Sequence, residues 1–122
     1  MNIKITIKDI SLRAVLNNTK TAKTIYNSLP IEAIPEKWGD EFYFEIPVEM
    51  PLDETATTKV KVGDIGYWPP GNALAIFFGP TPISSGEDPV PASDVNMVGK
   101  ILDDARVLKT IKGTYKIKIN KG

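Results

Sequence analysis

The sequence predicts a mainly β protein, a closed antiparallel barrel of about eight strands with two capping α-helices. Apolar and polar residues alternate at both ends of the chain, with the period of a half-buried strand. Short apolar segments between them are separated by turns rich in Gly and Pro. No repeated alternation of strand and helix runs through the middle, as a parallel sheet would require. At 122 residues the chain can bury a core of its own, so we expect one domain over residues 1–122.

The first two strands and the last strand follow from this alternation. Residues 3–7 and residues 115–119 place Ile or Tyr on one face and polar side chains on the other. Because the two segments share one pattern, we expect them to pair and to place both termini at the seam of the closed sheet. Residues 12–16 form the second strand, after a tight turn at residues 9–11.

Two segments have the period of a helix. Between residues 19 and 29, apolar side chains recur at i, i+3, i+4 and i+7, Thr19 or Asn18 can cap the start, and Pro30 ends the segment. The second helix is expected over residues 103–112, where acidic residues at the start and lysines at the end suit the helix dipole.

Six further strands are expected between the two helices, and the two polar stretches among them are expected to be surface loops. The strands are residues 31–38, 41–48, 59–62, 64–68, 73–78 and 95–102, and the loops are residues 50–58 and 81–93.

Composition and charge exclude several classes of function. The chain has no His and no Cys, which removes disulfides, thiolate metal sites and most familiar acid-base, nucleophilic and metal chemistry. Fifteen Lys and Arg balance fifteen Asp and Glu, without the basic stripe that a nucleic-acid partner needs. No segment resembles a signal peptide or approaches the roughly 20 apolar residues of a membrane span. We therefore expect a cytoplasmic protein with no membrane partner, no cofactor and no metal.

The most informative stretch is residues 63–82, two short strands joined by a stiff aromatic turn and followed by a proline-bounded loop. Aromatic rings beside rigid turns lose little side-chain entropy on contact, so they suit the docking of an apolar or prolyl group. For each ring the alternative is packing in the core, and residues 69–71 either hold a ring against the pocket or only form a tight turn. The expected ligand-binding aromatic residues are Trp38, Tyr43, Tyr67, Trp68 and Phe78.

Asp40, Glu41 and Glu45 form the densest group of carboxylates. Paired carboxylates can perform acid-base chemistry or hold a hard cation. In a strand, however, Glu41 and Glu45 share one face with Tyr43 between them, which favours a solvated outer surface. The sequence therefore predicts no catalytic residue and no metal ligand.

Four runs, in this order and spacing, resemble cyclophilins. They are Lys20-Thr21-Ala22, Ala75-Ile76-Phe77-Phe78, Asn96-Met97-Val98-Gly99-Lys100-Ile101 and Val107-Leu108-Lys109-Thr110-Ile111. The resemblance implies a cyclophilin-like barrel.

A small bacterial and archaeal branch of cyclophilin-like proteins, of uncharacterised function, is similar over roughly residues 25–112. The similarity lies in Trp38-Gly39-Asp40-Glu41, in residues 63–71 and in Phe77-Phe78-Gly79. It implies the fold strongly and the activity hardly at all.

The catalytic residues of cyclophilins are largely missing. Residues 31–38, which match the segment with the catalytic arginine, contain none, and Lys37 is the only cation there. We include Lys37 among the expected ligand-binding residues, although it lacks the planar fork of donors of an arginine. Residues 41–45 replace the motif with the family's glutamine, and no tryptophan or histidine occurs in residues 92–95. Phe78 aligns with the aromatic residue that floors the proline pocket.

These observations favour a binding module with an aromatic cleft for a peptide, including a prolyl group, or for a small apolar ligand. One alternative is a weak peptidyl-prolyl cis-trans isomerase with a degenerate site, because an amide rotation barrier of about 18–20 kcal/mol needs more than an apolar pocket. Another is a structural partner in a larger complex, which would use an exposed strand edge or the long loops.

Overall fold

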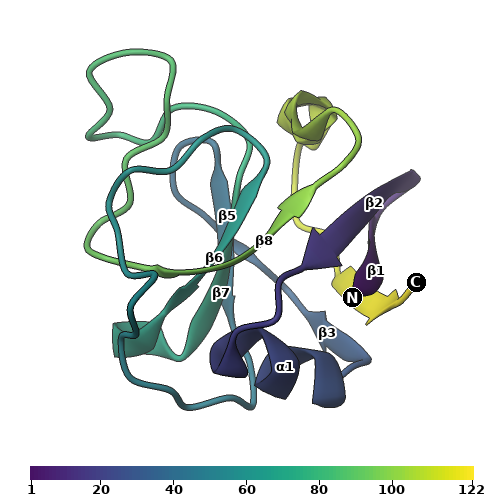
Figure 1. The fold of residues 1–122 in the computed structure, drawn as a ribbon. Helices are drawn as coiled ribbons and strands as arrows, with labels where there is room; N and C mark the ends of the chain where they lie inside the picture. Colours follow the sequence, from purple (N-terminus) through teal and green to yellow (C-terminus); the bar gives the residue numbers. More distant parts are fainter.

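The computed structural model of residues 1–122 shows one antiparallel sheet of nine strands that curls strongly into a half-barrel (Figure 1). The strand order across the sheet is β3-β9-β1-β2-β8-β6-β7-β5-β4. The elements are β1 Asn2–Ile7, β2 Ile10–Leu16, α1 Lys20–Asn27, β3 Ile31–Ala33, β4 Glu36–Lys37, β5 Glu41–Glu45, β6 Asp64–Trp68, η1 Pro69–Gly71, β7 Ala73–Phe77, β8 Asn96–Ile101, η2 Ala105–Thr110 and β9 Ile117–Lys121.

The sheet does not close, so the prediction of a closed barrel of eight strands is wrong. Its two edge strands, β3 and β4, follow each other in the chain but share no hydrogen-bonded ladder. The single strand expected over residues 31–38 is split between them at Ile34 and Pro35. Proline cannot donate to a ladder, which confines it to edges and strand ends. The mainly β class is confirmed. The two edges of the sheet are joined only by the chain between β3 and β4.

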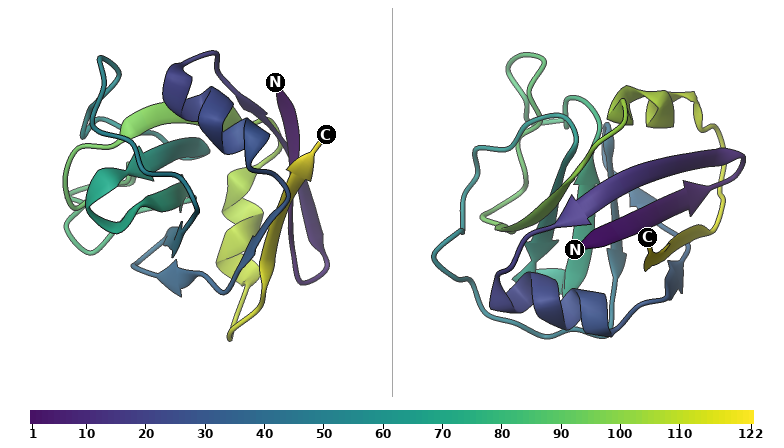
Figure 2. Two further views of the ribbon diagram at one scale, coloured as in Figure 1. Left: turned by 90° about the horizontal axis from the view of Figure 1, so that it is seen from below. Right: turned by 45° about the vertical axis from the view of Figure 1, so that its right-hand side comes forward.

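The pairing of the terminal strands is confirmed. β1 pairs antiparallel with β9, with Ile5 opposite Ile119, and β1 also pairs with β2. The two termini consequently lie close together (Figure 2). The prediction that they lie at the seam is wrong, because β9 also pairs with β3, and β3 forms the open edge of the sheet.

One of the two expected helices is confirmed. α1 begins after Thr19, whose side-chain oxygen accepts a hydrogen bond from the Ala22 N–H at 3.2 Å. The second segment is a short 3-10 helix, η2, instead of an α-helix. Its buried residues are Ala105 and Leu108, and together with the buried Ile111 that follows the helix they are spaced by three, the period of a 3-10 helix. In Figure 1, α1 lies at the lower end of the curled sheet and η2 at the upper end. No helix has the length and apolar character that a bilayer crossing needs.

The other strands in the middle are mostly as predicted, with one exception. β6 has the predicted bounds, and β5, β7 and β8 lie within the predicted segments. Residues 59–62 do not form a strand, because the backbone N–H groups of Lys59 and Lys61 bond to the side chains of Thr57 and Asp64. Thr57 itself forms an isolated antiparallel bridge with Val95, with both N···O distances at 3.0 Å.

The sheet is covered on both faces in its β6-β7-β5 region. The concave face holds the main core, to which Leu74 and Ile76 of β7 belong. The convex face carries a second cluster of Val60, Ala75, Phe77 and Val95. All five residues of β7 are therefore buried, and the convex face of this region is where the candidate site lies.

Candidate functional site

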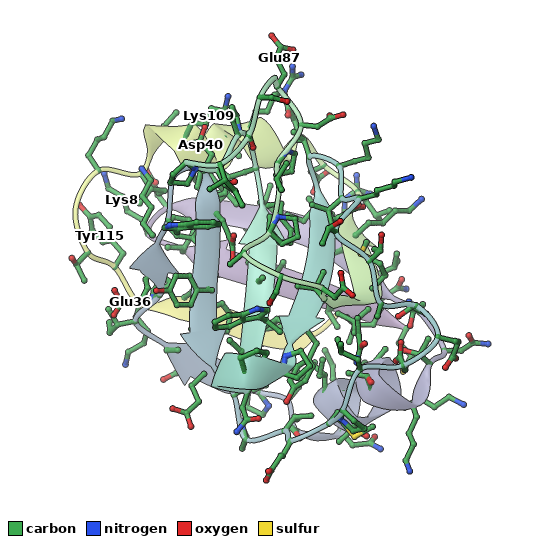
Figure 3. The ribbon with its side chains drawn as sticks, turned by 90° about the vertical axis from the view of Figure 1, so that its left-hand side faces the viewer. Lys8, Glu36, Asp40, Glu87, Lys109 and Tyr115 are labelled. Carbon is green, nitrogen blue, oxygen red and sulfur yellow. The ribbon has the colours of Figure 1, made fainter.

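A hollow of about 240 Å³ opens on the convex face of the sheet. Residues from β5 and β6, from the turn before β5 and from residues 91–95 meet there. The lining consists of Trp38, Glu41, Tyr43, Trp68, Pro91, Ala92 and Val95. Figure 3 shows the sheet with its side chains from the left-hand side of Figure 1.

A tight turn places Trp38 beside Glu41. The two residues flank Gly39 and Asp40, and the Trp38 N–H donates to the Glu41 carbonyl oxygen at 2.9 Å. Gly39 has a φ of 60°, and a Cβ there would lie 2.9 Å from the carbonyl oxygen of Pro80, so only glycine fits without strain. The Asp40 N–H donates to the same oxygen at 2.9 Å. The turn is thereby fixed to the next loop, which holds Trp38 and Glu41 in place.

Trp68 and Tyr43 form the aromatic wall of the hollow. Their rings meet edge to face, with centroids 6.5 Å apart and an interplanar angle of 69°. The Trp68 Nε1–H donates to the Ser93 hydroxyl at 2.7 Å, which ties the ring to residues 91–95. A Cβ on Gly71 would lie 3.0 Å from the Trp68 ring. η1 is therefore both the turn between β6 and β7 and a support for Trp68.

Residues 91–95 cross the convex face because one strand residue there has no side chain. A Cβ on Gly66 of β6 would lie 2.8 Å from a methyl group of Val95. The absence of that Cβ lets Val95 pack directly on the sheet. Val95 is thus buried and forms one side of the hollow.

Glu41 is the one acidic residue that lines the hollow. Glu41 is only 7% exposed, and its Oε1 atom has no hydrogen-bond partner. Burial raises the pKa of the Glu41 carboxyl from 4.5 to about 7, because a low-dielectric surrounding disfavours the charged form. The prediction that Glu41 lies on a solvated outer surface is wrong. Glu45, on the same face of β5, is exposed as expected.

The covering of the convex face explains this difference. Alternation along β5 does place Glu41 and Glu45 on one face, but Glu41 lies beside Trp38 and opposite Phe77, where the hollow is walled. Sequence reasoning missed Glu41 as a site residue. The signal that could have found it is the Trp-Gly-Asp-Glu run, in which a two-residue turn sets the first and last residues side by side.

The structure brings together three of the six expected ligand-binding residues, Trp38, Tyr43 and Trp68. Phe78 is wholly buried in the main core and packs on Phe42, with ring centroids 4.8 Å apart. Tyr67, Lys37 and Phe78 do not line the hollow.

Tyr67 is also wholly buried, and its hydroxyl donates to the Val48 carbonyl oxygen at 2.6 Å and accepts from the Met50 N–H at 3.1 Å. Desolvation raises the pKa of this phenol. Lys37 is exposed on the edge strand β4. Ligand binding by any of the six residues stays a prediction.

The charged groups around the hollow do not neutralise Glu41. Tyr43 is the only other titratable residue in the lining. Asp40, the preceding residue, lies 3.7 Å from the Lys109 ammonium of η2 (Figure 3). No group of three or more His, Cys, Asp or Glu side chains is placed to hold a metal ion. The site therefore offers aromatic walls and one unpaired carboxyl group.

Comparisons with known proteins agree with the fold. The model of the cyclophilin-like family matches residues 1–120. The solution structure of a hypothetical protein, AF2241 from Archaeoglobus fulgidus, is 31% identical, has a TM-score of 0.83, and its match covers 100% of this chain and 95% of that one. The expected resemblance to an archaeal relative is thereby confirmed.

A more distant similarity is to the structure of McbB in complex with tryptophan. The identity is 15%, the TM-score is 0.70, and the match covers 98% of this chain and 44% of McbB. The chain thus spans less than half of McbB, and the likeness shows a shared fold. A search of curated proteins found no match.

Proposed function

The chain belongs to the cyclophilin-like family, and on that premise we propose that it is a binding module whose convex-face hollow takes a small ligand with an apolar ring. The observation that carries the proposal is the half-buried aromatic wall of Trp38, Tyr43 and Trp68 around an unfilled hollow. Rigid rings that keep part of their surface free can bind a ligand at little cost in side-chain entropy.

The size of the hollow favours a single ring over an extended peptide. Its volume is about 240 Å³, and an apolar protein cavity of about 150 Å³ is enough to bind benzene. An extended peptide needs a long groove, whereas only seven residues line this hollow. A ring with a short chain fits these limits.

The alternative functions have less support. An isomerase of the cyclophilin kind would use Phe78 as the floor of a proline pocket, and the Phe78 ring lies inside the core. A structural partner that adds a strand would need a long free edge, and the edge strands β3 and β4 have three and two residues. McbB is bound to tryptophan in its structure. Because the identity is low, we use tryptophan only as a probe for binding and do not infer the function from it.

Intrinsic fluorescence tests the proposal directly. The chain has two tryptophans, and both line the hollow, so the whole tryptophan signal reports on this site. We expect 2-phenylethanol, which emits little under tryptophan excitation, to change the emission in a saturable way. Tyr43→Leu should weaken this binding, whereas Tyr115→Leu, at a half-buried tyrosine outside the hollow (Figure 3), should not.

An exchange NMR series on Xaa-Pro peptides separates the remaining hypotheses. Faster cis-trans exchange would favour an isomerase, and peptide shifts without faster exchange would favour peptide recognition. If none of 2-phenylethanol, 2-phenylethylamine and free tryptophan binds, the last followed by calorimetry, the proposed function is wrong.

A further inference from the structure

We propose that Glu41 is the polar anchor of the hollow and that the ligand is an amine, a small apolar ring that carries one protonated amino group. The inference rests on the proposed binding function and names the ligand class. It starts from two independent features of the site, a walled hollow and an unpartnered carboxylate within it.

The Glu41 side chain lacks a hydrogen-bond donor. Buried polar atoms in folded proteins almost always have a partner, and an ionised carboxylate can only accept hydrogen bonds. The Oε1 atom of Glu41 has none, although the residue is only 7% exposed. The main chain does not supply a donor, since the Trp38 N–H bonds to the Glu41 carbonyl oxygen instead. Because Glu41 lines the hollow, a ligand there can supply the missing donor.

The Glu41 carboxyl also lacks a positively charged neighbour. No Lys or Arg lines the hollow. The nearby cations lie elsewhere, because Lys109 faces Asp40 and Lys37 is exposed on β4. Burial, without a contribution from any charged neighbour, raises the pKa of Glu41 to about 7. At neutral pH the carboxyl is thus partly ionised, and a cation would complete its ionisation.

The walls of the hollow are largely aromatic. The electron-rich faces of Trp and Tyr rings attract cations, and Trp38, Tyr43 and Trp68 surround the same hollow as the carboxyl. An ammonium group therefore finds both a charge-assisted hydrogen bond and aromatic faces. A neutral alcohol loses the charge, and a carboxylate ligand meets a like charge.

The experiment compares three ligands with one ring and different head groups, namely 2-phenylethylamine, 2-phenylethanol and 3-phenylpropionate. Tryptophan fluorescence gives their affinities at about pH 8, where Glu41 is ionised and the amine, like a lysine, is still protonated. We expect the amine to bind at least about tenfold more tightly than the alcohol, and 3-phenylpropionate to bind most weakly.

Glu41→Gln should abolish this order, so that the amine and the alcohol bind alike. Glu45→Gln is the matched control, since it makes the same change on the same face of β5 at an exposed position. The control should keep the order. Urea unfolding of both variants shows whether each is folded under the binding conditions.

Proton release gives a second readout that a purely structural carboxyl would not produce. At about pH 7, pairing with an ammonium favours the ionised form of Glu41, so binding of the amine should release protons. Calorimetry in buffers with different ionisation enthalpies measures this release in the unaltered chain. The alcohol should release none.

The failures are distinguishable. If all three ligands bind with similar affinity, or if the amine preference survives in Glu41→Gln, the inference is wrong and the proposed function stands. If binding of the amine by the unaltered chain releases no protons, the anchor role is also wrong. If no ligand binds, the proposed function is wrong and the inference with it.

Discussion

Replacing Glu41 with Gln should stabilise the folded chain at neutral and alkaline pH and have little effect in acid. The pKa of Glu41 is raised from 4.5 to about 7 by burial. Between these two values the folded state binds more protons than the unfolded state, so the free energy of unfolding falls as pH rises. The contribution of a protonated Glu41 is complete below about pH 4.5 and is lost as pH passes through about 7. Gln cannot ionise, so it avoids this loss.

The size of the effect follows from the shift. A rise from 4.5 to about 7, at about 1.36 kcal/mol for each pKa unit, corresponds to about 3 kcal/mol. This is a large part of the roughly 5–15 kcal/mol that stabilises a typical domain. The free energy of unfolding of Glu41→Gln minus that of the unaltered chain should therefore grow by about this amount between acid and alkaline conditions.

Urea unfolding followed by far-UV circular dichroism at a series of pH values measures the difference. Comparing each variant with the unaltered chain cancels the titration of the other carboxylates, and Glu45→Gln should show a difference that hardly changes with pH. A difference for Glu41→Gln that stays constant from about pH 4 to about pH 8.5 would refute the assignment of a desolvated carboxyl at this site.

Three further changes test the packing around the site. Phe78→Ala should lower the free energy of unfolding by about 3–5 kcal/mol, because the ring is fully buried. The affinity of the folded chain for 2-phenylethanol should not change. A loss of affinity in a variant that is still folded would show that Phe78 contributes to ligand binding. Tyr67→Phe should cost about 1–3 kcal/mol in urea unfolding, since it deprives the Val48 carbonyl of its donor. Gly99→Ala should cost about 1–3 kcal/mol, because its Cβ would meet the Val15 carbonyl oxygen across the β2–β8 ladder; hydrogen exchange in that ladder would then speed up.

The strands of this fold are largely predictable because their side chains alternate. Residues 3–7 and 115–119 carry the period of a half-buried strand, and their pairing follows from it, although the last strand is Ile117–Lys121, two residues later than predicted. The errors occur where local hydrogen bonds compete with the ladder. Residues 59–62 give their backbone donors to side chains, and Pro35 lies between two edge strands that the pattern joined into one.

The second predicted α-helix is a 3-10 helix in the structure. Its acidic start and basic end suit either kind of helix, and Asp104 does cap the segment by accepting from the Arg106 N–H at 3.1 Å. The spacing of the buried residues decides between the two. A repeat of three, as in Ala105, Leu108 and Ile111, favours the 3-10 form over six residues.

The candidate site was harder to predict than the strands, because a periodic pattern assigns a side chain to a face without saying what covers that face. Glu41 and Glu45 point the same way from β5, yet only Glu41 is buried. The difference arises from residues far away in sequence, since Val95 rests on Gly66 and Ser93 holds Trp68 over the sheet. Residues 91–95 cover only part of the convex face and leave a hollow beside them. Glu41 lines this hollow, where it loses contact with water without gaining a hydrogen-bond partner for Oε1. A carboxyl in that position is a natural anchor for a ligand that brings its own donor.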